Sequence, residues 1–413
     1  MKRFTHKYIA ILLTLFSLLM PHSSLAIESQ TLQDDARMDS VHISLLTCSP
    51  GKEVWSLFGH TAIRYQDLAT GEDYVVNYGL FSFNQEYFIP RFVFGKTDYL
   101  MGIAPFDVFM AEYTAEGRGV VQQNLNLTDE EKTAIANAIG ENYKPENRTY
   151  RYNFFYDNCT TRARDIITDA IRGKVVYPTG DRKNDPTYRQ MVERHTQVYP
   201  WEEEGINILL GANADKETPL WTRQFLPDSL RKDFDDAKII TWNGQERKLV
   251  SSKEVLLDAT NDDIIAERSI LSPLNVCVMF FLVVCGITMA EKKYRKSFWL
   301  FDAFMLFFTG LAGLALLAMV FSEHPTVSFN PQILIFNPLN LVFLIPLIKS
   351  HRKGKYHWSE YIIVMCAVVY LISEIFFIDG AYASFTLASC LLVRLVGGNV
   401  NCRRIKNKVT TNN

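Results

Sequence analysis

The chain has 413 residues and a formal net charge of −2, from 43 basic and 45 acidic side chains. A chain this long exceeds one ordinary domain, and the balanced charge lacks the basic surplus of nucleic-acid-binding proteins, so no nucleic acid partner is expected. Apolar residues gather in the last third of the chain, which predicts a polar part followed by a membrane part.

The chain starts with the pattern of a secretory signal peptide over residues 1–26. Basic side chains precede an apolar run over residues 8–20, and a small-residue cleavage motif follows at residues 24–26. An uncleaved anchor is the alternative, although the run is short for a membrane span. In both cases the segment after residue 26 is exported.

Residues 54–65 and 73–78 have strand character, and turn formers lie between them. This pattern predicts a β-hairpin with His60 on its first strand. Counting outward from the turn places Asn77 and Tyr78 near His60 across the pair.

Two helices are expected further along the chain. Residues 128–131 form a capping box that opens the first, and an aromatic extended run follows over residues 149–156. The second helix covers residues 163–172, with Asp157 or Asn158 as its cap. Residues 201–236 carry no recognisable motif, and they are interpreted either as a lid or as a brace against the membrane.

Cys159 falls in the first turn of the second helix, where unpaired N–H groups and the helix dipole favour an anion. A thiolate is the reactive form of cysteine, so Cys159 is the candidate nucleophile, His60 its base and Asn77 the group that orients the ring. A buried, unreactive thiol is the alternative. Cys48 is a competing nucleophile in a turn before the hairpin, or a disulfide partner of Cys159. No metal-binding spacing is present.

Five apolar stretches approach the ~20 residues that cross a bilayer. Their bounds are 274–290, 298–321, 332–348, 361–378 and 381–397. Lys and Arg cluster after the first, third and fifth stretches and are absent from the other two loops. This alternation predicts an exported soluble domain and a cytoplasmic C-terminus. The third stretch contains Pro338 and Pro346, so a broken helix is expected there.

Three motifs then resemble a known family. Residues 58–64 (FGHTAIR), 77–79 (NYG) and 157–162 (DNCTTR) resemble the Bacteroides-type lipoprotein N-acyltransferases, whose exported domain was long of unknown function and precedes a five-helix membrane domain. The resemblance extends through residues 225–227 and the apolar tail. It covers nearly the whole mature chain.

The order of His60 before Cys159 also resembles the permuted papain-like folds of the NlpC/P60 superfamily, including the lecithin:retinol acyltransferase group. The resemblance implies an α+β periplasmic domain over residues 27–270 and an all-α membrane domain of about five transmembrane helices over residues 271–400. A cytoplasmic tail over residues 401–413 completes a multi-pass inner-membrane protein. The retinol-type enzymes carry a second histidine where this chain has Asn77, which leaves the third catalytic member open.

The implied activity is transfer of an acyl chain from a phospholipid, through a Cys159 thioester, to the N-terminal amine of a lipoprotein, without a cofactor. The expected substrate contacts are Asn158, Arg64, Arg162 and Tyr78, although structural ion pairs are the alternative for both arginines. A cell-wall amidase or peptidase of the NlpC/P60 type and a non-catalytic scaffold remain open. A hydrolase needs at most one anchor, and a scaffold would keep its activity after Cys159→Ala.

Overall fold

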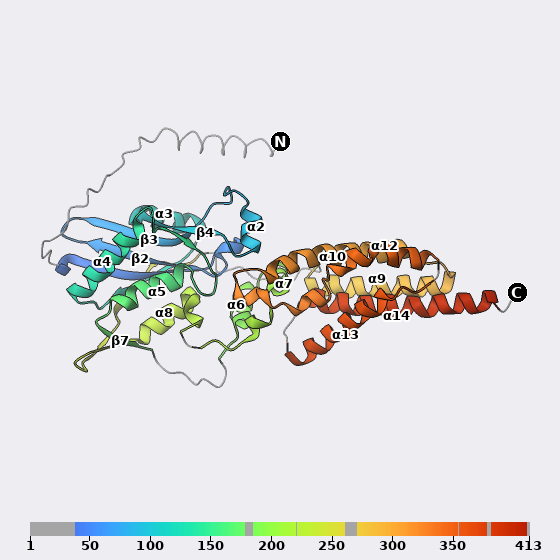
Figure 1. The fold of residues 1–413 in the computed structure, drawn as a ribbon. Coiled ribbons are helices and arrows are strands. Elements are labelled where there is room, and N and C mark those ends of the chain that lie inside the picture. Colours follow the sequence, from blue (N-terminus) through green and yellow to red (C-terminus); the bar gives the residue numbers. More distant parts are fainter. Residues whose placement is uncertain are drawn as a thin grey trace. The chain divides into compact units, whose positions relative to one another are not determined.

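The computed structural model describes residues 38–177, 185–219, 221–260, 271–353, 355–377 and 381–410. The expected signal peptide lies outside the described residues. A mixed α/β N-terminal part is followed by a helical C-terminal part (Figure 1). The α/β and helical classes expected from the sequence are therefore both present.

The N-terminal part is organised around a seven-stranded antiparallel sheet with the strand order β10-β5-β1-β2-β3-β4-β6. Its strands are β1 (Val41–Cys48), β2 (His60–Asp67), β3 (Glu72–Leu80), β4 (Asp98–Pro105), β5 (Val120–Leu125), β6 (Thr149–Arg151) and β10 (Val250–Leu257). A second, three-stranded sheet contains β7 (Gly173–Val176), β8 (Lys238–Thr241) and β9 (Glu246–Lys248).

The predicted hairpin is formed by β2 and β3, but β2 starts at His60 and not at Val54. Gly59 causes the late start: its φ is +79°, and a side chain there would put a Cβ 2.6 Å from the Cys48 carbonyl oxygen. Pairing between β2 and β3 ends at Ala62 opposite Asn77. The strands separate beyond that pair, and His60 pairs only with β1.

Helices cover both faces of the large sheet, as the alternation of side chains along each strand requires. Helices α4 (Asp129–Tyr143), α5 (Cys159–Ala170) and α8 (Pro227–Asp236) bury one face, and α3 (Phe106–Glu116) buries the other (Figure 1). Ile63 of β2 belongs to the first core and its neighbour Ala62 to the second. The predicted capping box is present at the start of α4.

Helices α6 (Tyr188–Thr196) and α7 (Pro200–Leu209), with the 3-10 turns η4 (Ala212–Asp215) and η5 (Arg223–Phe225), form a segment that contacts the membrane part. The Glu204 carboxylate accepts hydrogen bonds from the Tyr382 and Ala383 N–H groups, and Asn330 donates to the Ile208 carbonyl at 2.8 Å. Of the two interpretations of residues 201–236, these contacts favour the brace.

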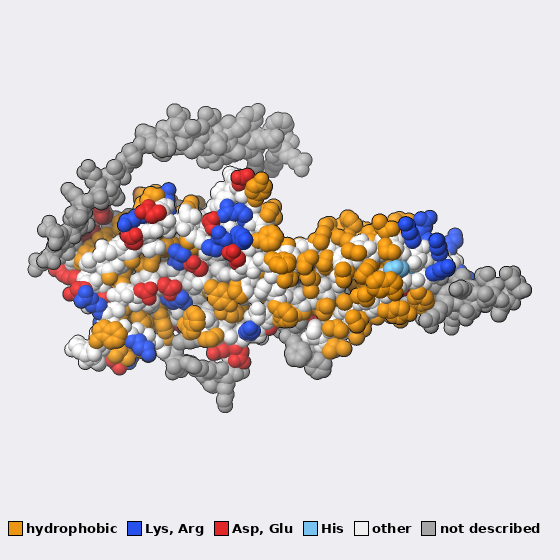
Figure 2. Space-filling view, viewed as in Figure 1, with side chains coloured by type: hydrophobic (Ala, Val, Ile, Leu, Met, Phe, Trp, Pro, Cys, Tyr) orange, Lys and Arg blue, Asp and Glu red, His pale blue; other side chains and the backbone are white. Residues whose placement is uncertain are grey.

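The membrane part contains α9 (Pro273–Tyr294), α10 (Trp299–Val320), α11 (Pro325–Ser328), α12 (Leu339–Arg352), α13 (Ser359–Phe377) and α14 (Tyr382–Thr410). Within the described residues, 273–294, 299–320 and 325–352 are long and apolar enough to span a bilayer, and 382–397 forms a shorter apolar helix. Hydrophobic side chains cover the visible face of these helices (Figure 2). The count of five spans stays a prediction.

The expected interruption of the third stretch is confirmed: α11, the 3-10 turn η6 (Pro331–Leu334) and α12 replace a continuous helix. Elsewhere in the membrane part, Arg394 of α14 donates to Asp302 of α10 at 2.7 Å and to Glu291 of α9 at 2.9 Å. His351 of α12 bonds Asp302 at 3.3 Å. Buried charges are stable only when paired, so this network ties the ends of α9, α10 and α12 to α14.

Candidate active site

Cys159 is the first residue of α5, as the sequence predicts, and its position is set by the cap before it. The Asn158 side-chain oxygen accepts hydrogen bonds from the Thr160 and Thr161 N–H groups, both at 2.9 Å, and the Thr161 hydroxyl accepts from the Asn158 N–H at 2.8 Å. This reciprocal capping box fixes the first turn of the helix. The thiol therefore emerges at the positive end of the helix dipole.

The cap also limits which N–H groups are free. The N–H groups of Thr160 and Thr161 donate to the Asn158 side chain, and the Arg162 N–H donates to the Asn158 carbonyl at 3.0 Å. Within the described part of the chain, the Cys159 N–H is the one that remains unpaired in this turn. The expectation of several free donors around the thiol is thus reduced to one.

A threonine pair seats α5 against β2 beside the thiol. The hydroxyls of Thr61 and Thr160, both fully buried, lie 3.1 Å apart in a hydrogen bond. Gly79, with φ of +90°, lies at an irregularity in the pairing of β3 with β4, next to Cys159: a Cβ at this glycine would lie 3.7 Å from the Cys159 Cβ. The positive φ favours glycine at position 79, although a Cβ there would make only ordinary contacts.

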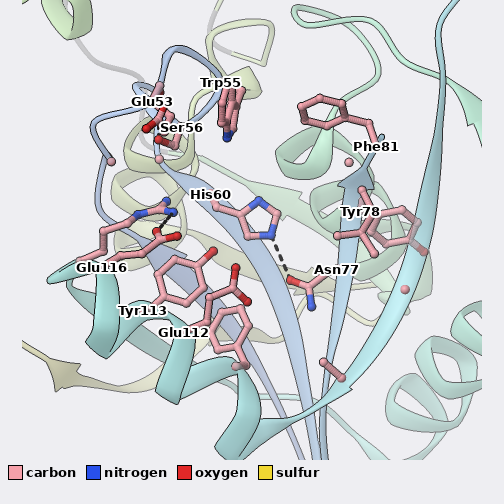
Figure 3. Close-up of a pocket in the computed structure, with 18 of the residues that line it drawn as sticks. Glu53, Trp55, Ser56, His60, Asn77, Tyr78, Phe81, Glu112, Tyr113 and Glu116 are labelled. Atoms are coloured by element: carbon pink, nitrogen blue, oxygen red, sulfur yellow. Dashed lines mark hydrogen bonds and ion pairs between the residues drawn. The ribbon is translucent and has the colours of Figure 1, made fainter. Parts of the chain in front are cut away.

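His60 faces Asn77, as the hairpin register predicts (Figure 3). The ring Nε2 lies 3.0 Å from the Asn77 side-chain oxygen. An amide oxygen only accepts hydrogen bonds, so Nε2 carries the proton in the neutral ring and Nδ1 is left as the basic nitrogen. Asn77 thereby selects the tautomer in which Nδ1 of His60 can accept a proton.

The thiol and the imidazole alter each other's protonation. Burial raises the pKa of Cys159, but the charge of His60 and hydrogen bonds to His60, the Thr61 N–H and the Thr160 hydroxyl together outweigh burial and lower that pKa to about 7. Burial lowers the pKa of His60, and the charge of Cys159 with hydrogen bonds to Cys159 and Asn77 raises it above its ordinary value. At neutral pH a substantial share of Cys159 is therefore thiolate.

Cys48 has the opposite environment. The sequence predicts a turn at Cys48, and this prediction is wrong. Cys48 is the last residue of strand β1 and lies directly opposite His60. Because strand pairing buries Cys48, desolvation raises its pKa to about 12. Both Cys48 and Cys159 are free thiols in the structure.

Two residues that are predicted to contact the substrate are instead bonded to other groups of the protein. Arg64 donates to Asp73 at 2.8 and 2.6 Å and to Gln122 at 2.8 Å, with its guanidinium over the Phe106 ring. The Asn158 amide donates to the carbonyls of Phe154 and Phe225, at 2.7 and 2.8 Å. These partners favour a structural role for Arg64 and Asn158.

The other two predicted contacts are Arg162 and Tyr78. Arg162 forms a two-bond ion pair with Asp157, at 2.6 and 2.8 Å, and its guanidinium lies 3.6 Å from the centre of the Tyr150 ring. Tyr78 is buried, and its hydroxyl has no hydrogen-bond partner within the described residues.

A cavity of about 560 Å³ lies beside His60 and Asn77 (Figure 3). Tyr78 and Gly79 also line this cavity, and Trp55 forms part of its apolar wall. Among the described residues, no group of three or more His, Cys, Asp or Glu side chains is arranged to hold a metal ion.

Sequence reasoning missed two residues here. The buried Tyr150 hydroxyl, 4.0 Å from a Cβ placed at Gly79, has no hydrogen-bond partner among the residues that the structure describes. Arg118 lines the cavity, is 7% exposed and leaves Nη2 unpaired within the same residues. Arg118 lies in the loop between α3 and β5 with no motif around it, so the sequence carries no signal for it.

Two models of known families match the chain. The family model of the Lnb N-terminal periplasmic domain matches residues 28–194, and that of the Lnb transmembrane domain matches residues 265–404. Together they match well over half of the chain. No curated protein and no solved structure matched it. The chain therefore belongs to the Lnb family, the Bacteroides-type lipoprotein N-acyltransferase family.

Proposed function

We propose that the protein transfers an acyl chain from a phospholipid, through a thioester on Cys159, to the N-terminal amine of lipoproteins in the cell envelope. One observation carries the proposal: a thiol with a pKa of about 7 lies at a helix start and is hydrogen-bonded to His60, which Asn77 orients. This is the arrangement of an activated cysteine nucleophile. Membership of the Lnb family supports lipoprotein modification as its use.

In the first step, His60 Nδ1 takes the proton from the Cys159 thiol, and the sulfur attacks the ester carbonyl of the phospholipid. A carbon–sulfur bond forms, the ester carbon–oxygen bond breaks, and His60 returns the proton to the departing lysophospholipid oxygen. The acyl chain is left on Cys159 as a thioester.

In the second step, the neutral α-amine of the lipoprotein attacks the thioester carbonyl. His60 accepts the proton that the amine loses, the carbon–sulfur bond breaks, and the thiolate leaves as an amide forms. The free Cys159 N–H supports this chemistry as a donor to the oxyanion in both steps. The unpaired Tyr150 hydroxyl supplies a second candidate donor.

The proposal includes a periplasmic domain with a permuted papain-like fold, which the following helices anchor in the inner membrane. The packing of the Cys159 helix on the antiparallel strand that carries His60 supports that fold. A cell-wall hydrolase would share the same chemistry, but it has no need of the extensive apolar helices that follow. The membrane part therefore favours a substrate that lives in the bilayer.

Lipoprotein mass spectrometry tests the proposal. The chain is expressed in a strain that lacks its own lipoprotein N-acylation, and the N-terminal acylation of a lipoprotein is determined. We expect triacylated lipoprotein with the wild type and none with Cys159→Ala. With His60→Ala the rate of acylation should fall about 100-fold or more. Cys48→Ala is the matched control and should keep its activity.

Two results would contradict the proposal. Diacylated lipoprotein in the strain that carries the wild type would exclude N-acyl transfer. An active Cys159→Ala beside an inactive Cys48→Ala would move the nucleophile.

A further inference from the structure

Large apolar side chains are exposed near the cavity, and two of them, Trp55 and Leu80, line it. Trp55 and residues 80–94 contribute them, and we call this set the aromatic ledge. Its exposed members are Trp55, Leu80, Phe83, Tyr87, Ile89, Phe92 and Phe94, which are 36% to 73% exposed. Soluble surfaces rarely gather so many large apolar groups, so such a patch marks a contact with another apolar phase.

The rings of the ledge are packed on one another. The Trp55 and Phe83 ring centres lie 5.4 Å apart, and those of Phe83 and Phe88 lie 5.1 Å apart. Phe88 opens the short helix α2 (Phe88–Val93), which stacks it on Phe92 at 6.2 Å. The ledge is thus a built surface, and hydrophobic side chains gather at α2 in Figure 2.

The ledge lies where a membrane helix ends. The Glu323 N–H, three residues after α10 ends at Val320, donates to the Phe94 carbonyl at 3.0 Å. A Cβ placed at Gly95 would lie 3.0 Å from the His324 ring, and Arg151 pairs with Glu323 at 3.1 Å. Trp and Tyr side chains prefer the level at which spans meet water. The ledge is therefore continuous with the apolar surface of α10.

A row of aromatic rings connects the ledge to the nucleophile. Phe81 lies 6.1 Å from Phe88 and 5.0 Å from Tyr99, and Tyr99 stacks on Tyr152 at 4.1 Å between ring centres. Tyr152 reaches within 3.9 Å of a Cβ placed at Gly79, the neighbour of Cys159. Trp55 and Phe81 also line the cavity together with His60 (Figure 3).

We propose that the aromatic ledge inserts into the periplasmic leaflet of the bilayer, and that phospholipid acyl chains pass along it to Cys159. The insertion stands on the exposed rings and their continuity with α10. The passage of acyl chains rests on the proposed function, because only a site that consumes lipid needs such a route.

Photocrosslinking tests the insertion without any acyl transfer. The full chain carrying Cys159→Ala is placed in phospholipid nanodiscs that contain a diazirine-labelled phospholipid, and adducts are mapped by mass spectrometry. We expect adducts within residues 80–94 as well as on the membrane helices. In the double variant Phe83→Ser, Ile89→Ser the ledge adducts should fall at least tenfold, because both exchanges remove apolar surface that the bilayer would bury.

The matched control is Leu68→Ser, an exposed apolar residue in the turn at the other end of β2, which should keep the ledge adducts. Adducts confined to the membrane helices would overturn the insertion. So would an effect of Leu68→Ser equal to that of the double variant.

A rate comparison tests the acyl route. Acylation of Cys159 from nanodisc phospholipid is measured against its alkylation by a small water-soluble reagent in the same protein. We expect the ratio of the two rates to fall about tenfold in the double variant and to stay constant in Leu68→Ser. An unchanged ratio would overturn the route. A wild type that crosslinks at the ledge but never forms a thioester would contradict the proposed function and leave the insertion standing.

Discussion

Two cysteines of the periplasmic domain show how position decides reactivity. Cys48 and Cys159 carry the same thiol, and both lie beside His60, one across the strand pair and one at the start of α5. Burial raises the pKa of Cys48 to about 12 because no cation offsets desolvation sufficiently. The pKa of Cys159 is about 7 because His60, together with hydrogen bonds from Thr61 and Thr160, outweighs its burial.

The pH dependence of alkylation checks this difference at the residue scale. The Cys159 thiolate forms as pH rises through its pKa, so its alkylation rate should be half-maximal near pH 7. In His60→Ala the largest offset to burial is lost and the hydrogen bonds from Thr61 and Thr160 remain, so the midpoint should move up toward the ordinary thiol value of about 8.5. Peptide mapping of alkylated protein in detergent gives both midpoints. Preferential alkylation of Cys48 below pH 8 would contradict the assignment.

At the scale of elements, the Asn158 cap at the start of α5 stabilises the fold and also positions the Cys159 thiol. Asn158 caps the helix with its oxygen and ties two loops with its amide, so one buried side chain fixes both the backbone and the thiol. Thr128 caps α4 in the same way but ties no loop and lies beside no reactive group.

Replacing the two caps separates these roles. Thr128→Ala should cost about 1 kcal/mol, and Asn158→Ala about 2–3 kcal/mol, because the carbonyls of Phe154 and Phe225 also lose their donor. Thermal unfolding of the full chain in detergent gives the order of stability. Only Asn158→Ala should also shift the alkylation midpoint of Cys159. A shift with Thr128→Ala would show that the effect is not local.

At the scale of the whole molecule, the brace and the aromatic ledge both tie the N-terminal part to the membrane helices. Glu204 holds the N-terminus of α14, where the helix dipole favours an anion, and the ledge meets the end of α10. Each connection is made by residues far apart in the sequence. The membrane part thus supports the N-terminal part in addition to anchoring it.

The orientation of the chain in the membrane is tested with reporter fusions. The alternation of basic loops predicts a cytoplasmic C-terminus, so a fluorescent protein fused after Asn413 should fluoresce, and alkaline phosphatase fused there should be inactive. Phosphatase inserted in the loop at Ser322 should be active. The reverse pattern would invert the topology and place Cys159 in the cytoplasm.

Local patterns in the sequence predicted the hairpin of β2 and β3, the capped starts of α4 and α5, and the interruption before α12. Each depends on neighbouring residues, through alternation, capping or proline geometry, so a single stretch of chain contains the information. The proximity of the His60 and Asn77 side chains followed from counting residues across one turn. The three family motifs carried the resemblance for the same local reason.

The tertiary structure decided everything that distant residues share. It buried Cys48 on β1, committed Arg64 to Asp73 and Gln122, and left Nη2 of Arg118 without a partner among the described residues. It also placed the exposed rings of residues 80–94 against the end of α10. A sequence records which side chains are present and how they alternate, but burial and partners arise only when distant segments pack, and those two quantities set pKa and access to lipid.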